Sequence, residues 1–266
     1  MEQIHDKRII ITGASSGIGK STALLLAEYR AKLVLVARNR KRLEDVRNGI
    51  LKRYSYCSTP LIFPCDVSNY LHVKKMVKTC NDIFGHIDIL INNAGIGVYG
   101  EYTAHDINDF KRLMSVNFFG ALYCIQEVLP FMLNNGKGQI INVASIAALH
   151  GIPYLSAYSA SKAALVSVCQ CLKAELSTTQ IEIKIIYPGY TNTPFFINEK
   201  RVGNAVRPDD HYAAPEKVAR NILRLICKKS GNKVLSFNGL KLAFLHHFMP
   251  DLLDKLLDHY AIRLKK

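Results

Sequence analysis

The sequence contains no Cys-x-x-Cys pair, and its seven cysteines are odd in number. Most of them lie in apolar or helix-like segments, which is typical of reduced core thiols rather than of a disulfide framework. Cys169 and Cys171 form a Cys-x-Cys pair, but no cluster of histidines and further cysteines accompanies them. We therefore predict that the protein binds no metal and lies in a reducing compartment such as the cytoplasm.

The first residues lack the pattern of a targeting segment. Asp6, Lys7 and Arg8 precede any long apolar run, so the sequence predicts neither a signal peptide nor an N-terminal membrane anchor. An apolar run at residues 240–249 is too short to cross a bilayer. These absences favour a cytoplasmic protein, with peripheral contact at a membrane surface as the alternative.

Acidic residues are scarce relative to basic ones, 21 against 35, which gives a net charge of +14. Clustered lysines and arginines attract phosphate, so this charge raises the question of nucleic acid binding. The densest basic run, residues 38–42, has helix-like spacing and is followed by Glu44 and Asp45. Because no recognised nucleic-acid-binding motif accompanies the charge, we interpret it as a solvated basic face and predict no nucleic acid partner.

Seven short β-rich runs alternate with longer segments of helical apolar periodicity along the 266 residues. The runs are residues 8–12, 32–37, 61–64, 87–93, 138–145, 181–188 and 233–237. They are apolar throughout rather than alternating, as in strands that helices cover on both faces. The sequence therefore predicts a single α/β domain over residues 1–266, with a Rossmann-type, doubly wound and mostly parallel seven-stranded sheet between helices.

Two segments stand apart from this alternation. Residues 191–214 break it, and because a long loop in a compact domain is usually functional, we expect a substrate loop there. Residues 240–266 form a C-terminal extension with the pattern of an amphipathic helix. Its apolar face comprises Leu252, Leu253, Leu256, Leu257, Tyr260 and Leu264. We expect this helix to dock on its own domain or on a subunit partner, with a membrane surface as the alternative.

A glycine-rich turn, TGASSGIG at residues 12–19, directly follows the first predicted strand and opens a helix-like segment. Glycine permits a tight turn and a close approach of the backbone, and the amides at a helix N-terminus attract phosphate oxygens. This context predicts a site for the pyrophosphate of a dinucleotide. The residues of this predicted site are Gly13, Ser15, Ser16, Gly17, Ile18 and Gly19.

The end of the second predicted strand, VARNR at residues 36–40, carries no carboxylate. Enzymes that use NAD tend to place an acid there for the ribose hydroxyls, whereas Arg38 offers a planar cation with several donors. A 2′-phosphate is therefore favoured, and we predict NADP(H) as the cofactor. Arg40, Lys41 or Arg42 could assist Arg38.

Tyr158 and Lys162 lie four residues apart in a segment of good helix formers, which places them on one helix face. Hydride transfer to a ketone leaves charge on the oxygen, so an acid must deliver a proton there. An ammonium near a phenol lowers the pKa of the phenol and makes it a better match for this task. On its own the pair is also compatible with an ordinary helix surface, and its weight comes from the other motifs.

The chain resembles the short-chain dehydrogenase/reductase family over about residues 5–240, because several motifs occur in the order typical of that family. The family's glycine motif matches residues 12–19, and its Asn-Asn-Ala-Gly motif matches residues 92–95. The positions that match its catalytic residues are Asn117, Ser145, Tyr158 and Lys162.

This resemblance implies a role for each catalytic position. Tyr158 would be the general acid/base, and Lys162 would lower its pKa and hydrogen-bond the nicotinamide ribose. Ser145 would hold the substrate oxygen. Asn117 would bind a water that links Lys162 to solvent as a proton relay.

The resemblance also places residues along the cofactor. Asp66 and Val67, in a CDVS stretch, would contact the adenine. Thr193 fits the position of a threonine that contacts the nicotinamide carboxamide, whereas Thr191 stands where many family members have Val or Ile. The other residues that the resemblance implies at the cofactor are Asn93, Ala94, Gly95, Tyr158, Lys162, Pro188 and Gly189.

The sequence thus predicts an NADP(H)-dependent oxidoreductase that interconverts a carbonyl and a primary or secondary alcohol. We expect an apolar or lipid-like substrate from the side chains around the predicted pocket: Ile146, Leu149, Ile152, Tyr154, Tyr190, Phe195 and Phe196. The family implies a homodimer or homotetramer that associates through the helices bearing Asn117 and Tyr158. The alternatives are a non-catalytic NADP-binding regulatory protein and a reductase associated with a lipid surface.

Overall fold

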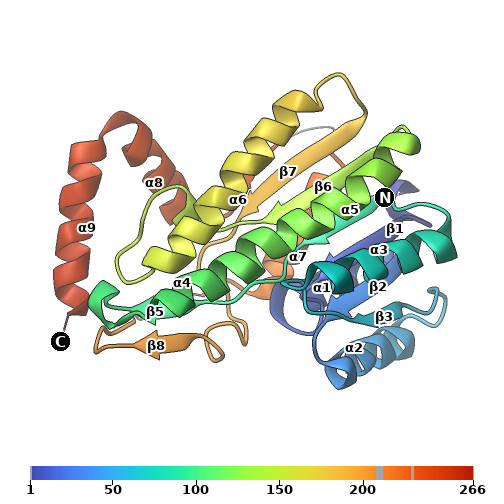
Figure 1. The fold of residues 1–266 in the computed structure, drawn as a ribbon, viewed down its shortest axis with the longest axis horizontal. Helices are drawn as coiled ribbons and strands as arrows, with labels where there is room; N and C mark the ends of the chain where they lie inside the picture. The colour runs from blue at the N-terminus through green and yellow to red at the C-terminus, as the bar shows by residue number, and fades with distance from the viewer. Residues whose placement is uncertain (1, 208–211, 229–230, 266) are drawn as a thin grey trace.

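The computed structural model describes residues 2–207, 212–228 and 231–265. Its central element is a seven-stranded sheet in the order β3-β2-β1-β4-β6-β7-β9, and every strand pairing in it is parallel (Figure 1). The strands are β1 (Arg8–Thr12), β2 (Lys32–Ala37), β3 (Leu61–Pro64), β4 (Ile89–Asn92), β6 (Gly138–Val143), β7 (Ile181–Tyr187) and β9 (Lys233–Val234). This arrangement confirms the predicted doubly wound α/β fold.

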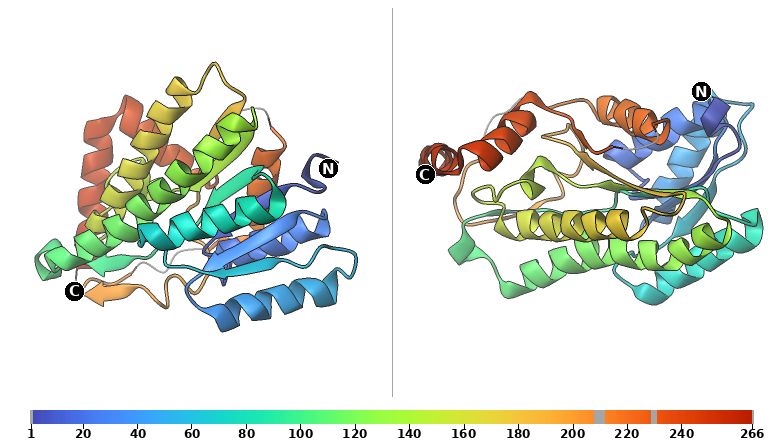
Figure 2. Two further views of the ribbon diagram at one scale, coloured as in Figure 1. Left: turned by 45° about the vertical axis from the view of Figure 1, so that its right-hand side comes forward. Right: turned by 90° about the horizontal axis from the view of Figure 1, so that it is seen from above.

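Helices cover both faces of the sheet (Figure 2). One face carries α1 (Gly17–Glu28), α2 (Arg40–Arg53) and α7 (Pro215–Ile226), and the other carries α3 (Tyr70–Phe84), α5 (Gly120–Asn134) and α6 (Ser156–Glu175). Shorter helical segments are Glu2–Ile4, Tyr102–Ala104, α4 (Ile107–Leu113), the π-helical turn Met114–Phe119, and Ile146–Ala148.

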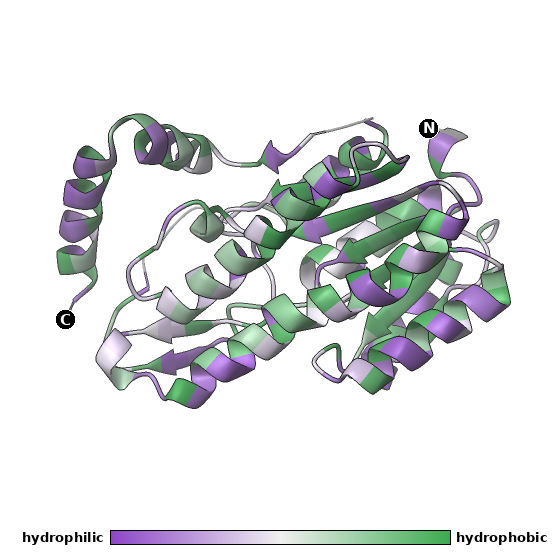
Figure 3. Cartoon of the chain, turned by 45° about the horizontal axis from the view of Figure 1, so that its top comes forward, coloured by the Kyte–Doolittle hydropathy of each residue, from purple (hydrophilic) through white to green (hydrophobic). Residues whose placement is uncertain are grey.

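Most strand residues are apolar because successive side chains enter two different cores. Ile9 and Ile11 of β1 pack with α1, α2 and α7, whereas Ile10 packs with α3, α5 and α6. Strand side chains alternate between the faces of a sheet, so a sheet covered on both faces favours apolar residues at successive positions. Figure 3 shows this hydrophobic interior along the strands.

The order of the sheet reverses between β1 and β4, since β2 and β3 lie on one side of this pair and β6 and β7 lie on the other. In open parallel sheets the ligand crevice forms at such a switch point, outside the carboxyl ends of the strands. The turn after β1 and the residues after β4 and β6 therefore meet at one edge.

A second, two-stranded parallel sheet forms between β5 (Val98–Gly100) and β8 (Lys200–Val202). The seven-run pattern does not predict it, because each strand has three residues and β8 lies inside the segment 191–214 that we expected to be a loop. This sheet anchors part of that segment to the chain that follows β4.

The C-terminal extension contains two helices, α8 (Phe237–Phe248) and α9 (Pro250–Leu264), rather than the single helix expected. Pro250 occupies the first turn of α9, where proline is tolerated, and it ends the hydrogen bonding of α8. Leu242, Leu245 and Leu253 form a small core between the two helices. The extension lies beside the carboxyl edge of the sheet (Figures 1 and 2).

Among the described residues, one continuous helical stretch, Ile107–Asn134, is long and apolar enough to cross a membrane by length and composition. It runs along α3 and α6 in the protein. Core helices of soluble proteins pass the same test, so this stretch alone indicates no membrane span.

Candidate active site

A cavity of about 1270 Å³ opens at the carboxyl edge of the main sheet. It extends from the turn after β1, past the ends of β4 and β6, to the helices α8 and α9. All the predicted catalytic and cofactor-binding residues line it except Gly19 and Asn117, which lie just behind its wall. The fold thus brings residues from seven separate motifs to one cavity.

The phosphate turn has the conformation that a bound anion requires. Gly17 begins α1 with φ +52°, which favours glycine, and a Cβ there would lie 2.9 Å from the side chain of Thr193. Ser16 is the N-cap of α1 but makes no side-chain capping hydrogen bond, so its hydroxyl does not satisfy the first amides of the helix. These amides fit a pyrophosphate group.

Gly19 and Asn93 support this turn from behind. A Cβ at Gly19 would lie 2.3 Å from the carbonyl oxygen of Gly13, so glycine is needed for α1 to approach the end of β1. Asn93 Nδ2 donates to the carbonyl oxygen of Thr12 at 2.9 Å, and Thr12 Oγ1 accepts from the amides of Asn93 and Ala94. Asn93 therefore ties β4 to β1 through its side chain, in addition to lining the cavity.

Arg38 and Asp66 lie at the end of the cavity predicted to hold the adenosine. Burial raises the pKa of Asp66, but two hydrogen bonds from Ser68 and the nearby charge of Arg38 together hold that pKa below its ordinary value. Arg38 is exposed and lines the cavity. Of the three assisting residues suggested by the sequence, Arg42 lines the cavity, whereas Arg40 pairs with Glu44 outside it.

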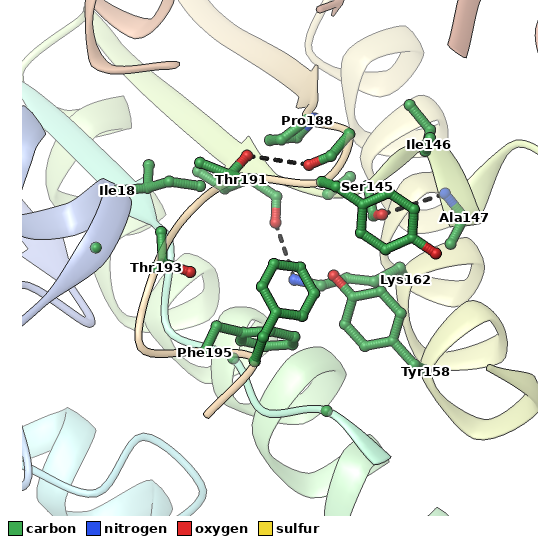
Figure 4. Close-up of a pocket in the computed structure, with 18 of the residues that line it drawn as sticks. Ile18, Ser145, Ile146, Ala147, Tyr158, Lys162, Pro188, Thr191, Thr193 and Phe195 are labelled. Atoms are coloured by element: carbon green, nitrogen blue, oxygen red, sulfur yellow. Dashed lines mark hydrogen bonds between the residues drawn. The ribbon is translucent and has the colours of Figure 1, made fainter. Parts of the chain in front are cut away.

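Ser145, Tyr158 and Lys162 converge at the other end of the cavity (Figure 4). Tyr158 and Lys162 lie one turn apart on α6, and Ser145 follows β6 as the N-cap of the short helix Ile146–Ala148. The Ser145 hydroxyl accepts from the amide of Ala147 at 3.2 Å, and the Ser145 side chain also acts on the pKa of the Tyr158 phenol. Lys162 Nζ donates to the carbonyl oxygen of Val143 at 2.9 Å.

Burial moves the two titratable groups of this cluster in opposite directions. It raises the pKa of Tyr158 to about 12, although the hydrogen bond with Ser145 opposes the shift. It lowers the pKa of Lys162 to about 8. Burial, rather than the charge of Lys162, therefore sets the pKa of the Tyr158 phenol in the protein alone. This differs from the role that the resemblance implies for Lys162, which is to lower that pKa.

Asn117 lies in the π-helical turn between α4 and α5 and is buried. Its Nδ2 donates to Ile96 O and to Ser161 Oγ, and its Oδ1 accepts from Ile96 N at 2.8 Å. Ser161 in turn donates to the carbonyl oxygen of Tyr158. Both donors of the amide are therefore used in holding the loop after β4 and the start of α6, and one lone pair of Oδ1 is left for the predicted relay.

The segment after β7 closes over the middle of the cavity. Thr191 is buried, its Oγ1 donates to the carbonyl oxygen of Gly189 at 3.0 Å, and it forms a β-bridge with Ala213. Thr193 packs on Gly17, so this segment touches the phosphate turn. Pro188 and Gly189 line the cavity beside Ser145, as Figure 4 shows for Pro188.

Most of the side chains that line the cavity towards α8 and α9 are apolar. Of the side chains expected there, Ile146, Ile152, Tyr190, Phe195 and Phe196 line it. Leu149 packs instead against the core of α8 and α9, and Tyr154 Oη donates to the carbonyl oxygen of Ala261.

Sequence reasoning missed several residues that line this end. Glu199 and Arg207 lie eight residues apart in the irregular segment, where no periodicity shows that they meet. Leu253, Leu256 and Tyr260 of α9 also line the cavity, and their amphipathic pattern predicts docking without showing where. Among the residues that the structure describes, no group of three histidines, cysteines or carboxylates could hold a metal ion.

Comparison with known proteins gives consistent matches. A family profile described as short chain dehydrogenase matches residues 7–202. A dehydrogenase/reductase SDR family protein 7-like from Anopheles gambiae is 34% identical over 255 residues, which cover 93% of this chain and 80% of the relative.

Solved structures share the fold over almost the whole chain. A short chain dehydrogenase/reductase from Burkholderia phymatum in complex with NAD has a TM-score of 0.84 at 24% identity, covering 95% of this chain and 96% of that one. A short chain dehydrogenase from Burkholderia cenocepacia in complex with NADP has a TM-score of 0.81 at 26% identity, covering 96% and 98%. Structures of this architecture therefore hold either nicotinamide dinucleotide.

Proposed function

This chain belongs to the short-chain dehydrogenase/reductase family of oxidoreductases, and we propose that it uses NADP(H) to interconvert a carbonyl and a primary or secondary alcohol. One observation carries the proposal: Ser145, Tyr158 and Lys162 converge at one end of a cavity whose other end is a glycine turn at the start of α1.

The chain's own residues account for the proton chemistry. The glycine turn and Arg38 would hold NADP(H), which when bound would provide the hydride for carbonyl reduction and accept it in alcohol oxidation. Ser145 Oγ and Tyr158 Oη hold the carbonyl oxygen, and Tyr158 donates its proton to that oxygen as charge develops on it. A phenol with a pKa of about 12 keeps its proton at neutral pH and can therefore serve as the acid. In oxidation the phenolate takes the proton from the alcohol.

Lys162 and Asn117 position this acid. Lys162 Nζ is fixed by the Val143 carbonyl oxygen and has two further donors for the nicotinamide ribose. Asn117 holds Ser161, which bonds the backbone of Tyr158.

The preference for NADP(H) over NAD(H) rests on the basic end of the cavity. Arg38 follows β2 where a carboxylate would otherwise accept bonds from the ribose, and Arg42 lines the cavity beside it. Two guanidinium groups there favour a 2′-phosphate.

Tyr158→Phe tests the mechanism directly. We expect the variant to lower kcat for carbonyl reduction by about 10²- to 10⁴-fold, because the proton donor is lost, while NADPH binding measured by fluorescence stays unchanged. Tyr187→Phe is the matched control, since Tyr187 is a buried tyrosine of β7 outside the cavity. Full turnover by Tyr158→Phe would exclude the mechanism, and an absence of turnover in the wild type would favour the alternative of a non-catalytic NADP-binding regulator.

We propose further that the substrate is apolar, that residues 191–214 are its loop, and that residues 240–266 are an extension of the single domain that completes the pocket. Residues 208–211 and 266 of these segments lie outside the described residues. The side chains of Phe195, Leu253 and Leu256 support this view. A homodimer or homotetramer through the helices that bear Asn117 and Tyr158 fits the exposed Phe119 on one of them, and light scattering would give its mass.

A reductase that works at a lipid surface is the second candidate. The rings of Phe244 and Phe248 of α8 contact each other in a tilted arrangement with centroids 5.0 Å apart, and the two residues are 56% and 66% exposed. They lie outside the cavity, on a helix whose Leu242 and Leu245 line it. An exposed aromatic pair beside an apolar cavity fits a surface from which a lipid-like carbonyl enters.

A further inference from the structure

A buried ion pair lies at the substrate end of the cavity. The guanidinium of Arg207 donates through Nη2 to Glu199 Oε2, and the two side chains are 6% and 1% exposed. Both line the cavity that contains Tyr158. Removing two charges from water costs several kcal/mol each, so a pair at this place needs a reason.

The pair has unused hydrogen-bonding atoms. Arg207 Nε and Nη1 and Glu199 Oε1 are buried and have no hydrogen-bond partner among the described residues. The rings of Tyr99 and Phe196 lie 4.5 and 4.7 Å from the guanidinium carbon and stabilise the charge, but ring faces leave the in-plane donors unsatisfied. Buried polar atoms of this kind are rare in native proteins.

Two aromatic rings, those of Phe195 and Phe196, connect the catalytic tyrosine to the pair. The Phe195 ring centroid is 5.8 Å from that of Tyr158 and 5.4 Å from that of Phe196, on which Arg207 packs. The charges of Glu199 and Arg207 also act on the pKa of Tyr158, in opposite directions. A substrate whose carbonyl meets Tyr158 therefore reaches the pair with its other end.

The unused atoms define the group that would satisfy them. A purely apolar end would leave two donors and one acceptor buried and unpaired, and an anionic end would face the Glu199 carboxylate. A hydroxyl accepts from Arg207 through its lone pairs and donates to Glu199 through its hydrogen.

We propose that Arg207 and Glu199 bind a hydroxyl group of the substrate, so that the substrate class is a largely apolar ketone or aldehyde with a hydroxyl at the end opposite the carbonyl. This inference rests on the proposed function, because Tyr158 fixes which end reacts. A different role for the pair, that of a latch that holds the segment 199–207 in place, predicts equal effects on all substrates.

Two ketones that differ in one group test the proposal. 4-(4-Hydroxyphenyl)butan-2-one carries a hydroxyl across a ring from the carbonyl side chain, and 4-(4-methylphenyl)butan-2-one replaces it by a methyl group of similar size. We expect wild-type kcat/KM to favour the hydroxyl probe by about 10- to 100-fold, as for a hydrogen bond to a charged group. Arg207→Met should abolish this preference, and Glu199→Gln, which keeps an acceptor, should retain most of it.

Lys200→Met is the matched control. Lys200 lies in the same segment and pairs with Asp109, but it does not line the cavity. This variant should keep the preference for the hydroxyl probe even if the segment becomes less stable. Equal kcat/KM for the two probes in the wild type, or an unchanged ratio in Arg207→Met, would overturn the proposal.

Failure of the proposed function has a different signature. In that case the wild type oxidises NADPH with neither probe. The affinities of both probes for the wild type and for Arg207→Met are then measured by calorimetry in the presence of NADPH. A wild-type preference for the hydroxyl probe that Arg207→Met loses supports the inference, and equal affinities of the wild type for the two probes overturn it.

Discussion

At the scale of single residues, Lys162 combines a charge with nearly complete burial. The unfolded chain titrates this amine at an ordinary pKa of 10.5, and the folded protein titrates it at about 8. Between these values the unfolded state binds more protons, so this group makes the free energy of unfolding rise with pH across that window. Below pH 8 the amine is protonated in both the folded and the unfolded state, and its burial lowers the free energy of unfolding by the full amount.

Lys162→Met removes this dependence. We expect the wild type to gain roughly 3 kcal/mol of unfolding free energy relative to the variant as the pH rises from below 8 towards 10.5. Urea denaturation at several pH values measures the difference, with Lys173→Met, exposed on the same helix, as the control. Parallel stability profiles of the wild type and Lys162→Met would contradict the lowered pKa.

Arg38 carries the proposed choice of cofactor. Arg38→Gln removes a charge-assisted bond to a 2′-phosphate, so we expect the ratio of NADPH to NADH affinity to fall by about 10- to 100-fold, with NADH binding unchanged. Arg40→Gln should leave the ratio unaffected, because Arg40 pairs with Glu44 outside the cavity. Fluorescence titration gives both affinities, and a ratio that survives in Arg38→Gln would assign the preference to another residue.

Sequence patterns identify residues through chemistry that is local in the chain. The glycine turn and the Tyr158–Lys162 spacing are of this kind, and the structure brings them to one cavity. The resemblance implies a proton relay at Asn117, whereas the hydrogen bonds of Asn117 to Ile96 depend on contacts between segments that no local pattern connects. No sequence pattern identifies Arg207 and Glu199 as a pair, because residues in an irregular segment follow no periodicity.

At the scale of elements, β-rich runs of four to eight residues predict all seven strands of the main sheet, although β9 comprises only Lys233 and Val234. The strands β5 and β8 escape this reasoning because three residues show no clear alternation, and their pairing depends on where β4 and β7 end. The break between α8 and α9 is marked in the sequence by Pro250, although the amphipathic pattern continues across it.

Leu253 decides whether α9 closes the cavity. It is 3% exposed between α8 and α9, whereas the neighbouring Leu252 is 39% exposed. Leu253→Ala should lower the free energy of opening of α9 by about 2–5 kcal/mol and raise KM for the carbonyl, while NADPH binding is unchanged. Hydrogen exchange of α9 measures the opening, and Leu252→Ala is the control. If both variants exchange alike, α9 is not held through this contact.

At the scale of the whole molecule, the cofactor end and the substrate end carry different kinds of surface. The cofactor end carries the basic residues after β2, and the substrate end carries the exposed aromatic pair of α8. A net charge of +14 draws the protein towards anionic surfaces in general, so charge alone does not identify a membrane.

The lipid-surface candidate therefore needs a test of its apolar contact. It predicts that the wild type sediments with vesicles of phosphatidylcholine and phosphatidylserine and that the double variant Phe244→Ser/Phe248→Ser remains largely in the supernatant. Ile107→Ser, exposed at the start of α4, should sediment as the wild type does. Equal sedimentation of the double variant and the wild type would remove α8 as the contact.

The closure by α9 also sets an order of events during synthesis. Leu253, Leu256 and Tyr260 line the cavity, so its wall includes a helix that leaves the ribosome after β1, β4 and α6. Domains begin to fold while the chain grows by roughly 5–20 residues per second. The glycine turn after β1 can thus form in a nascent chain before α9 is available to close the cavity.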